Sequence, residues 1–500
     1  MSGRDGAAGF LGRAGPLVLA RFATALLGIS VPLVLARMLP LEDYGTYKQL
    51  FLIAQTLTFV LPLGIPQGLF YFLPRAQQRR SWLFQSLAFM ALMGLMAAVG
   101  VWLLVPALAQ GLGNPGLQDH RLTLALYTGA MVGSFGLELT LTARGRTGHA
   151  AVAYLVSDVT RAGLLVLPPL FGLGLDAMMQ AICAYALVRW GLAWFSGLWG
   201  EEGALWSGAN WRAQVRYALP FGAAMALAIP QQYAHQYAVA WAVAPAAFAI
   251  YAVGCFQLPL VDLLYTPTSE VLMVRVGELD GEGRRAEAVE AFREASARLA
   301  YVFLPMAAFL FAAAPDFIAA LFGARFLEAV PLFRVSVLAI ALAILPMDGV
   351  LRARGRTRAI FLSYLTKAVA TVPLVWFGVT RFGMIGGITS WALAELVGKL
   401  TLLMAIPGAL ELRGLRAALP LRDLAKASGA AGLAALAVAV LREGVGAGLP
   451  VLGAHPEGWL RVVPLAIAGL GFLGGYALLL RLVGVDPVGV LSAFRARKGS

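Results

Sequence analysis

The chain has 500 residues, of which 60% are hydrophobic and only 13% are charged, and its formal net charge is +13. A chain of this length with so little polar surface cannot fold in water, so the composition predicts a polytopic membrane protein. The two cysteines, Cys183 and Cys255, both fall inside apolar stretches, which leaves neither a disulfide framework nor a cysteine metal cluster.

A spanning helix needs roughly 20 apolar residues, and about fourteen stretches meet that requirement. In chain order they are 15–39, 47–73, 82–107, 121–143, 149–174, 176–199, 214–242, 246–274, 298–322, 328–350, 359–380, 383–408, 424–441 and 459–482. The stretches are continuous and rich in Leu and Ala, unlike the alternating strands of a membrane barrel. We therefore predict an all-α fold. Arg4 and Arg13 precede the first stretch, which we interpret as an uncleaved signal-anchor.

A pentapeptide repeat indicates a duplication. Residues 143–147 and 353–357 both read ARGRT, each between two long apolar stretches, and the same offset of 210 residues aligns Tyr154 with Tyr364. We predict two six-helix lobes, residues 1–199 and 200–410. A basic linker, two extra helices without counterpart and a tail follow in residues 411–500. Two such bundles around a midplane site are typical of alternating-access transporters.

Basic residues gather in alternate connections between the predicted spans, whereas the intervening connections 172–174 and 244–246 carry none. By the positive-inside rule the basic side is cytoplasmic, with both termini on it. The net charge then reflects topology and attraction to anionic lipids, and we expect no nucleic-acid binding. The basic connections contain Arg75, Arg79 and Arg80; Arg144 and Arg146; Arg212 and Arg216; Arg275, Arg284, Arg285, Arg293 and Arg298; Arg352 to Arg358; Arg413 to Lys426; and Arg495, Arg497 and Lys498.

Two segments follow a recognisable pattern. The first reads LARMLPLEDYGTY at 35–47, with Gly-Ile-Pro at 64–66, and the second reads PDFIAALFG at 315–323 and continues to RFLEA at 325–329. They resemble the connections of spans 1/2 and 9/10 in the Wzx-like polysaccharide flippases of the multidrug/oligosaccharidyl-lipid/polysaccharide exporter superfamily. The resemblance implies two lobes around a central cavity that opens alternately inward and outward. It also implies a lipid-linked oligosaccharide as cargo, carried across the bacterial inner membrane.

A polyprenyl-diphosphate sugar brings an anionic head group into a layer where unpaired charge costs several kcal/mol, so the cavity must supply cations. Arg189 and Lys399 are 210 residues apart, which places one cation at equivalent depth in each lobe. Arg21, near the cytoplasmic start of the first span, could instead snorkel to the interface. The predicted diphosphate contacts are Arg21, Arg161, Arg189, Lys367 and Lys399.

Internal neutralisation is the alternative for these cations. Asp158 precedes Arg161 by three residues and Glu395 precedes Lys399 by four, so each acid and base share a helix face. In a functional version, Asp158, Glu395 and Asp262 take up a coupling ion and release a cation for the substrate. The sequence leaves proton, sodium and membrane potential alone open as the driving force.

Two further acids, Glu138 and Asp348, are also 210 residues apart, each about two turns before an ARGRT loop. Their position near the cytoplasmic end favours pairing with the neighbouring arginines over ion coupling.

The most polar run inside a predicted span is PQQYAHQY at 230–237. Gln231 and His235 share one helix face, and Gln232 and Gln236 share another. Such donor and acceptor surfaces suit a hydroxyl-rich glycan if they face a cavity, and hydrogen bonds between helices are the alternative. A single His without ligand-spaced partners predicts no metal site.

The sequence therefore favours a non-enzymatic flippase over several alternatives. A lipid II flippase or multidrug exporter would share the fold, although in-span cations would repel cationic drugs. A membrane glycosyltransferase or polymerase would need paired carboxylates on an outer loop, which 106–120 and 443–458 lack. We expect no cofactor beyond a coupling ion, and no ATP-binding loop is present. The implied partners are membrane lipid, a polysaccharide polymerase and chain-length proteins.

Overall fold

A computed structural model of the chain describes residues 26–446, 462–487 and 489. Every regular element in these ranges is a helix, as the all-α prediction requires. Ten of these helices are long and apolar enough to cross a membrane. Every predicted span overlaps a helix within the described ranges, but the total of fourteen crossings stays a prediction.

The contacts divide the chain into two compact units that meet between Ala249 and Ile250. The predicted lobe boundary lies earlier, at 199/200, and the difference has a physical cause. Helix α10 (Gly208–Ala242) begins the second predicted lobe but packs on α2, α3 and α4 of the first unit. The repeat boundary itself stays a prediction.

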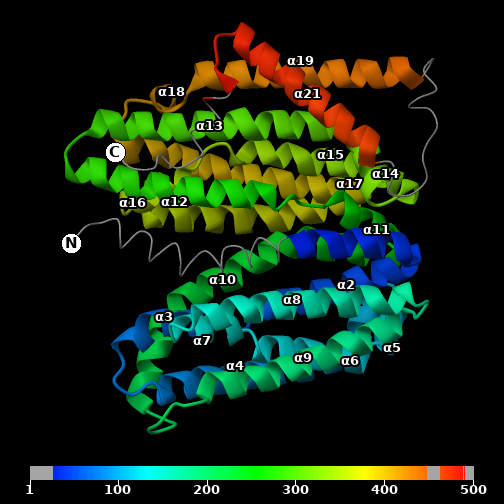
Figure 1. The fold of residues 1–500 in the computed structure, drawn as a ribbon, viewed down its shortest axis with the longest axis vertical. Coiled ribbons are helices and arrows are strands. Elements are labelled where there is room, and N and C mark those ends of the chain that lie inside the picture. Colours follow the sequence, from blue (N-terminus) through cyan, green and yellow to red (C-terminus); the bar gives the residue numbers. More distant parts are fainter. Residues whose placement is uncertain (1–25, 447–461, 488, 490–500) are drawn as a thin grey trace. The chain divides into compact units, whose positions relative to one another are not determined.

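The first unit is a bundle in which α4, α6 and α9 lie side by side (Figure 1). Its helices are Leu26–Met38, α2 (Leu41–Val60), α3 (Ile65–Phe72), the 3-10 helix η1 (Leu73–Arg75), α4 (Arg80–Gly111), α5 (Gly116–Asp119), α6 (Arg121–Gly133), α7 (Leu137–Ala143), α8 (Thr147–Leu170), α9 (Leu175–Leu198), α10, and α11 (Pro245–Gly254), which crosses the boundary. The predicted span 47–73 breaks between α2 and α3, where Gly64 is left-handed (φ 76°) and Pro66 follows in the first turn of α3.

The second unit packs α13 against α12 and α19, and α17 against α15 and α16. Its elements are α12 (Leu260–Gly281), α13 (Arg285–Ala312), α14 (Ala314–Leu321), η2 (Ala324–Ala329), α15 (Val330–Leu338), η3 (Ala339–Ala343), α16 (Met347–Ala353), α17 (Thr357–Leu410), α18 (Leu415–Ala418), α19 (Leu421–Gly446) and α21 (Val462–Leu482). Within α17, Gly383 has non-helical angles (φ 58°, ψ −135°), so this segment is two helices joined at a kink. Those two helices correspond to the predicted spans 359–380 and 383–408.

The two ARGRT segments fold alike. In both copies a seven-residue helix, α7 or α16, ends at the alanine, and the following glycine is left-handed (Gly145 φ 77°, Gly355 φ 63°). The amide of Arg146 donates to Leu141 O at 3.0 Å, and that of Arg356 donates to Leu351 O at 2.8 Å. This is a helix-ending motif that requires a left-handed residue, which explains the glycine. The local match at an offset of 210 residues supports the duplication.

Candidate functional site

Arg189 on α9 and Glu138 on α7 form a two-point ion pair inside the first unit. Nη1 and Nη2 of Arg189 each lie 2.7 Å from a carboxylate oxygen of Glu138, and Nη1 also donates to the Ser157 hydroxyl at 2.5 Å. The side chains are 11% and 6% exposed. Glu138 was expected to pair with arginines of the ARGRT loop, and this expectation is wrong because Arg189 of α9 takes both carboxylate oxygens. The charge of Arg189 is neutralised.

Arg161 on α8 is paired within its own helix. Its Nη2 lies 3.3 Å from Asp158, the partner three residues earlier, as the neutralisation alternative predicts. The guanidinium also interacts with Tyr127 of α6 and is 36% exposed, far more than that of Arg189. This pair is longer and less buried than the two-point pair of Arg189, so the carboxylate holds Arg161 less tightly than Glu138 holds Arg189.

Lys48 is an in-span cation that the sequence reasoning missed. Its ammonium lies 5.3 Å and 5.6 Å from the ring centroids of Tyr44 and Tyr47 on the same helix, α2. It forms no ion pair with any residue that the structure describes. The predicted span started at residue 47, which put Lys48 at the interface. Because α2 begins at Leu41, Lys48 lies two turns inside the helix.

In the second unit, Glu395 pairs with Lys367 rather than with Lys399. Both residues belong to α17, on opposite sides of the kink at Gly383, which folds the helix back on itself. Lys399 instead lies over the ring of Tyr265, 5.0 Å from its centroid, and has no ion pair within the described ranges. The Glu395–Lys399 pair of the neutralisation alternative is therefore wrong, because the hairpin brings Lys367 closer to the carboxylate.

Asp348 is surrounded by donors. The Tyr265 hydroxyl donates to it at 2.5 Å, the Ser269 hydroxyl at 3.0 Å and Arg352 Nη2 at 2.5 Å. Arg352 belongs to the connection around the second ARGRT loop, so pairing with a neighbouring arginine is confirmed for Asp348. With its oxygens already satisfied, Asp348 is held as an anion beside the ring that carries Lys399.

Residues that correspond at the offset of 210 form different ion pairs in the two units. Glu138 corresponds to Asp348 and Arg189 to Lys399. In the first unit the acid and the cation of this pair neutralise each other directly. In the second unit the acid is bound by Arg352, and Lys399 is left facing an aromatic ring. Of the predicted diphosphate cations that the structure describes, only Lys399 lacks a carboxylate partner.

The polar run of α10 divides between two faces, as predicted. Gln231 and His235 are buried at 7% and 3% exposure, whereas Gln232 is exposed and Gln236 is half-buried. Both amide atoms of Gln231 lack a hydrogen-bond partner in the described part of the protein. A buried amide without partners is costly, so this side chain can accept a ligand or a water molecule.

One predicted site residue has a different place from the one expected, and another cannot be placed. Asp262 was expected at mid-depth of a span. Because the helix breaks between α11 and α12, it lies in the first turn of α12 and is exposed. Arg21 falls outside the described residues. The described residues also contain no group of three His, Cys, Asp or Glu side chains that could hold a metal ion.

The first arginine of each ARGRT copy fastens its loop to the end of another helix. Arg144 donates to Trp199 O at 2.8 Å and pairs with Glu201 at 2.7 Å, just after α9. Arg354 pairs with Asp280 and, at 3.5 Å, with Glu411 after α17. Glu201 and Glu411 are themselves 210 residues apart. The repeated loop therefore has a repeated partner that the sequence reasoning did not identify.

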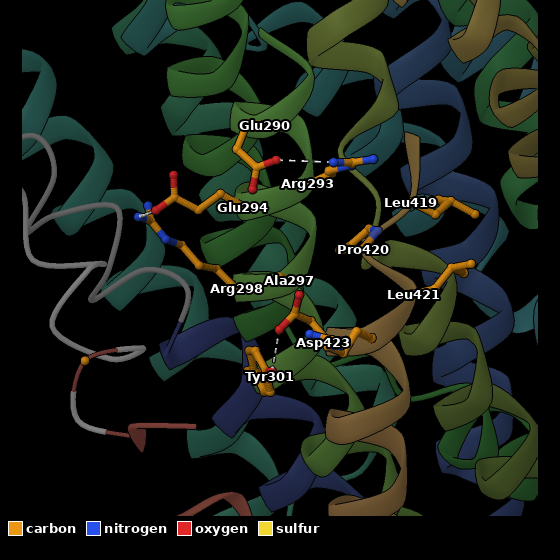
Figure 2. Close-up of a pocket in the computed structure, with 12 residues that line it drawn as sticks. Glu290, Arg293, Glu294, Ala297, Arg298, Tyr301, Leu419, Pro420, Leu421 and Asp423 are labelled. Carbon is orange, nitrogen blue, oxygen red and sulfur yellow. Dashed lines mark hydrogen bonds and ion pairs between the residues drawn. The ribbon is translucent and has the colours of Figure 1, made fainter. Parts of the chain in front are cut away.

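A pocket of about 610 Å³ lies between α13 and the start of α19 in the second unit (Figure 2). Its charges are balanced, since Arg293 pairs with Glu290, Arg298 with Glu294, and Asp423 accepts from the Tyr301 hydroxyl. None of the predicted diphosphate, glycan or coupling residues lines it.

Solved structures with the same fold are transporters. The chain aligns with a structure described as "Lipid II flippase MurJ, inward closed conformation" at a TM-score of 0.69 and 13% identity, covering 93% of this chain and 99% of that one. An inward-facing multidrug resistance MATE family transporter gives 0.61 and 14%, covering 78% and 96%. A MOP superfamily transporter from Pyrococcus furiosus, described as having a binding pocket of reverse polarity, gives 0.53 and 14%, covering 80% and 95%.

The chain is therefore a multi-pass membrane protein with the fold of the MOP transporter superfamily. The family described as "Polysaccharide biosynthesis protein" matches residues 34–331, more than half of the chain, and the protein belongs to that family. No curated protein matches the sequence.

Proposed function

We propose that the protein is an alternating-access flippase for a polyprenyl-diphosphate-linked oligosaccharide, carrying it from the cytoplasmic to the outer leaflet of the bacterial inner membrane. Membership of the polysaccharide biosynthesis family and the fold shared with a lipid flippase support this function. Both termini are then cytoplasmic. A polysaccharide polymerase and chain-length proteins are the partners expected next to it in the membrane.

The observation that carries the proposal is the state of Lys399. A cation within a spanning helix and without a counter-ion is costly unless an anion visits it. Lys399 forms no ion pair within the described ranges. Its ammonium faces the Tyr265 ring, and the nearby acids Asp348 and Glu395 are already bound by Arg352 and Lys367. A substrate diphosphate supplies the missing negative charge. Among the predicted diphosphate contacts, we assign Lys399 and the partly exposed Arg161 as those most available to the substrate.

Arg189 and Lys367 take a different part in this scheme. Each is bound by a carboxylate, Glu138 or Glu395, so each must exchange that partner before it can bind a diphosphate. Protonation or sodium binding at Glu395 would release Lys367 and link ion uptake to substrate binding. Asp158 could release Arg161 in the same way. The glutamines of α10, above all the unpartnered Gln231, are the proposed glycan contacts.

The test compares Lys399→Gln with Arg481→Gln in proteoliposomes that contain a fluorescent polyprenyl-diphosphate oligosaccharide. Arg481 is an exposed arginine in the last turn of α21, outside both predicted lobes, and serves as the matched control. We expect flipping to be lost in Lys399→Gln and retained in Arg481→Gln, with both proteins folded. Wild-type flipping in Lys399→Gln would remove its assigned role, and no flipping by the wild type would refute the function.

Lipid II transport is the second candidate, favoured by the likeness to MurJ over nearly the whole chain. The proteoliposome assay, run with each lipid in turn, distinguishes the two candidate substrates. Faster flipping of lipid II than of the polyprenyl-diphosphate oligosaccharide would favour the second candidate.

A further inference from the structure

Three arginines in the described structure are fixed in the same way, by an aromatic ring together with a backbone carbonyl of the aromatic residue. Arg75 lies with Cζ 4.2 Å from the Tyr71 ring centroid and donates to Tyr71 O at 2.6 Å. Arg121 and Arg334 show the same arrangement on Trp102 and Phe311. None of the three has an acidic partner among the described residues. Each is a preorganised cation with donors to spare.

Arg75 and Arg121, the two that belong to the first unit, lie at different ends of it. Arg75 ends η1, at the same end of the first unit as the start of α4 and the start of α10, which the positive-inside rule predicts to be cytoplasmic. Arg121 begins α6 on the opposite side of the 32-residue helix α4. In the first unit, Arg75 is therefore the stacked arginine at the end where a substrate from the cytoplasmic leaflet would enter.

An aromatic cluster holds this end together. Tyr71 stacks on Tyr217 of α10 with centroids 5.0 Å apart and planes 19° apart, and Phe72 stacks on Trp82 of α4 at 4.3 Å. Tyr71 and Tyr217 remain 43% and 48% exposed. The cluster fixes Arg75 in position and leaves two phenol groups at the surface. No hydrogen bond of either hydroxyl is found in the described ranges.

The surroundings of Arg75 carry an excess of positive charge. Arg79, Arg212 and Arg216 are exposed and form no ion pair with any described residue. The contrast with the pocket of Figure 2 is direct, since there Arg293 and Arg298 each hold a glutamate. The exposed linker residues Arg413, Arg416 and Arg422 are unpaired within the described part too. For these three linker arginines, no ring or carbonyl contact is found in the described ranges, whereas Arg212 Nε donates to Gly208 O at 3.2 Å.

We propose that Arg75, with Arg79, Arg212 and Arg216, forms a capture site for the diphosphate and first sugar of the lipid-linked substrate. The inference rests on the proposed function and adds an entry site to it. A fixed planar guanidinium suits two-point binding of a phosphate. The hydroxyls of Tyr71 and Tyr217 lie where they can bond the sugar next to the diphosphate. Bulk anionic lipid needs no such fixed geometry.

The test measures initial flipping rate against substrate concentration for Arg75→Gln, Arg75→Lys and the matched control Arg121→Gln. We expect Arg75→Gln to raise the half-saturating concentration about tenfold, the loss expected for one charged hydrogen-bonding contact, with the maximal rate little changed. Arg75→Lys keeps the charge but loses the planar guanidinium. Its half-saturating concentration should therefore lie between those of the wild type and Arg75→Gln. Arg121→Gln should match the wild type. An unchanged half-saturating concentration in Arg75→Gln would overturn the capture site while leaving the flippase function intact.

A binding experiment tests the capture site independently of the flippase function. It also distinguishes a diphosphate ligand from the phosphate of an anionic lipid. Purified protein in detergent is titrated with farnesyl diphosphate, with and without phosphatidylglycerol. We expect weaker binding to Arg75→Gln than to wild type or Arg121→Gln, and little competition from phosphatidylglycerol. This difference would support the site even if the wild type flipped no substrate. Equal binding by all three proteins, or full competition by phosphatidylglycerol, would contradict it.

Discussion

At the scale of single residues, Arg189 and Glu138 are 51 positions apart and meet between α9 and α7 in a nearly dry environment. Arg189→Met would leave the Glu138 carboxylate buried without its counter-charge. We expect a loss of about 3–5 kcal/mol in stability, because an unpaired buried charge costs more than the pair contributes. Thermal unfolding in detergent measures the loss.

The control for this prediction is Arg161→Gln in the same unit. Its ion pair with Asp158 is longer and less buried than that of Arg189, so we expect a smaller loss than for Arg189→Met. Adding Glu138→Gln to Arg189→Met should recover most of the stability, since no buried charge then remains. If the double variant is as unstable as the single one, packing rather than charge explains the effect of Arg189.

These pairs also show what the sequence could reveal about the site. Spacing within one helix correctly identified Asp158–Arg161, because residues three apart share a face. It failed for Glu395, whose partner Lys367 is 28 residues away and reaches it only through the kink at Gly383. Partners set by tertiary folding leave no local spacing to read. The 210-residue repeat was more informative than local spacing, since it related Glu138 to Asp348 from the sequence alone.

At the scale of elements, α4 and α6 cross at two glycines. A Cβ on Gly94 would lie 2.4 Å from Gly129 O, and one on Gly129 would lie 2.7 Å from Gly94 O. Small residues that let helix backbones approach closely are characteristic of membrane helix packing. The crossing therefore depends on both glycines. A hydropathy profile does not reveal such a contact between helices.

We expect Gly129→Ala to force α4 and α6 apart and to destabilise the protein by about 1–3 kcal/mol, the usual cost of overpacking. Gly100→Ala on α4 is the matched control, since its Cβ would meet nothing within 4 Å. That change should be neutral or stabilise the helix by up to about 1 kcal/mol. Unfolding midpoints of the two variants provide the comparison, and equal midpoints would rule out a tight crossing.

Hydropathy predicted where the helices of the chain lie but not where they are interrupted. The predicted span 121–143 is two helices, α6 and α7, and 246–274 divides into α11 and α12. The interruptions occur within continuously apolar sequence. The mean hydropathy of a sequence window therefore does not fall at these breaks. The displaced Asp262 is a direct result, because its depth was counted along an unbroken span.

At the scale of the whole molecule, the duplication and the positive-inside rule together make a definite claim about sidedness. Both ARGRT loops carry arginines, fold alike and bind repeat-related glutamates, so both should lie on the cytoplasmic side. The connection around Leu173, which has no cations, should lie outside. If both loops lie on the same side, the chain must cross the membrane an even number of times between them.

Cysteine labelling tests this arrangement, because the chain has only Cys183 and Cys255, one buried and one half-buried. Gly148→Cys and Arg358→Cys are exposed positions just after the two loops, and Leu173→Cys marks the other side. A membrane-impermeant maleimide should label only Leu173→Cys in cells with a permeabilised outer membrane, and both loop cysteines in inside-out vesicles. The unsubstituted protein controls for Cys183 and Cys255. Opposite labelling of Gly148→Cys and Arg358→Cys would mean an odd number of crossings between the loops, and parallel lobes would then be excluded.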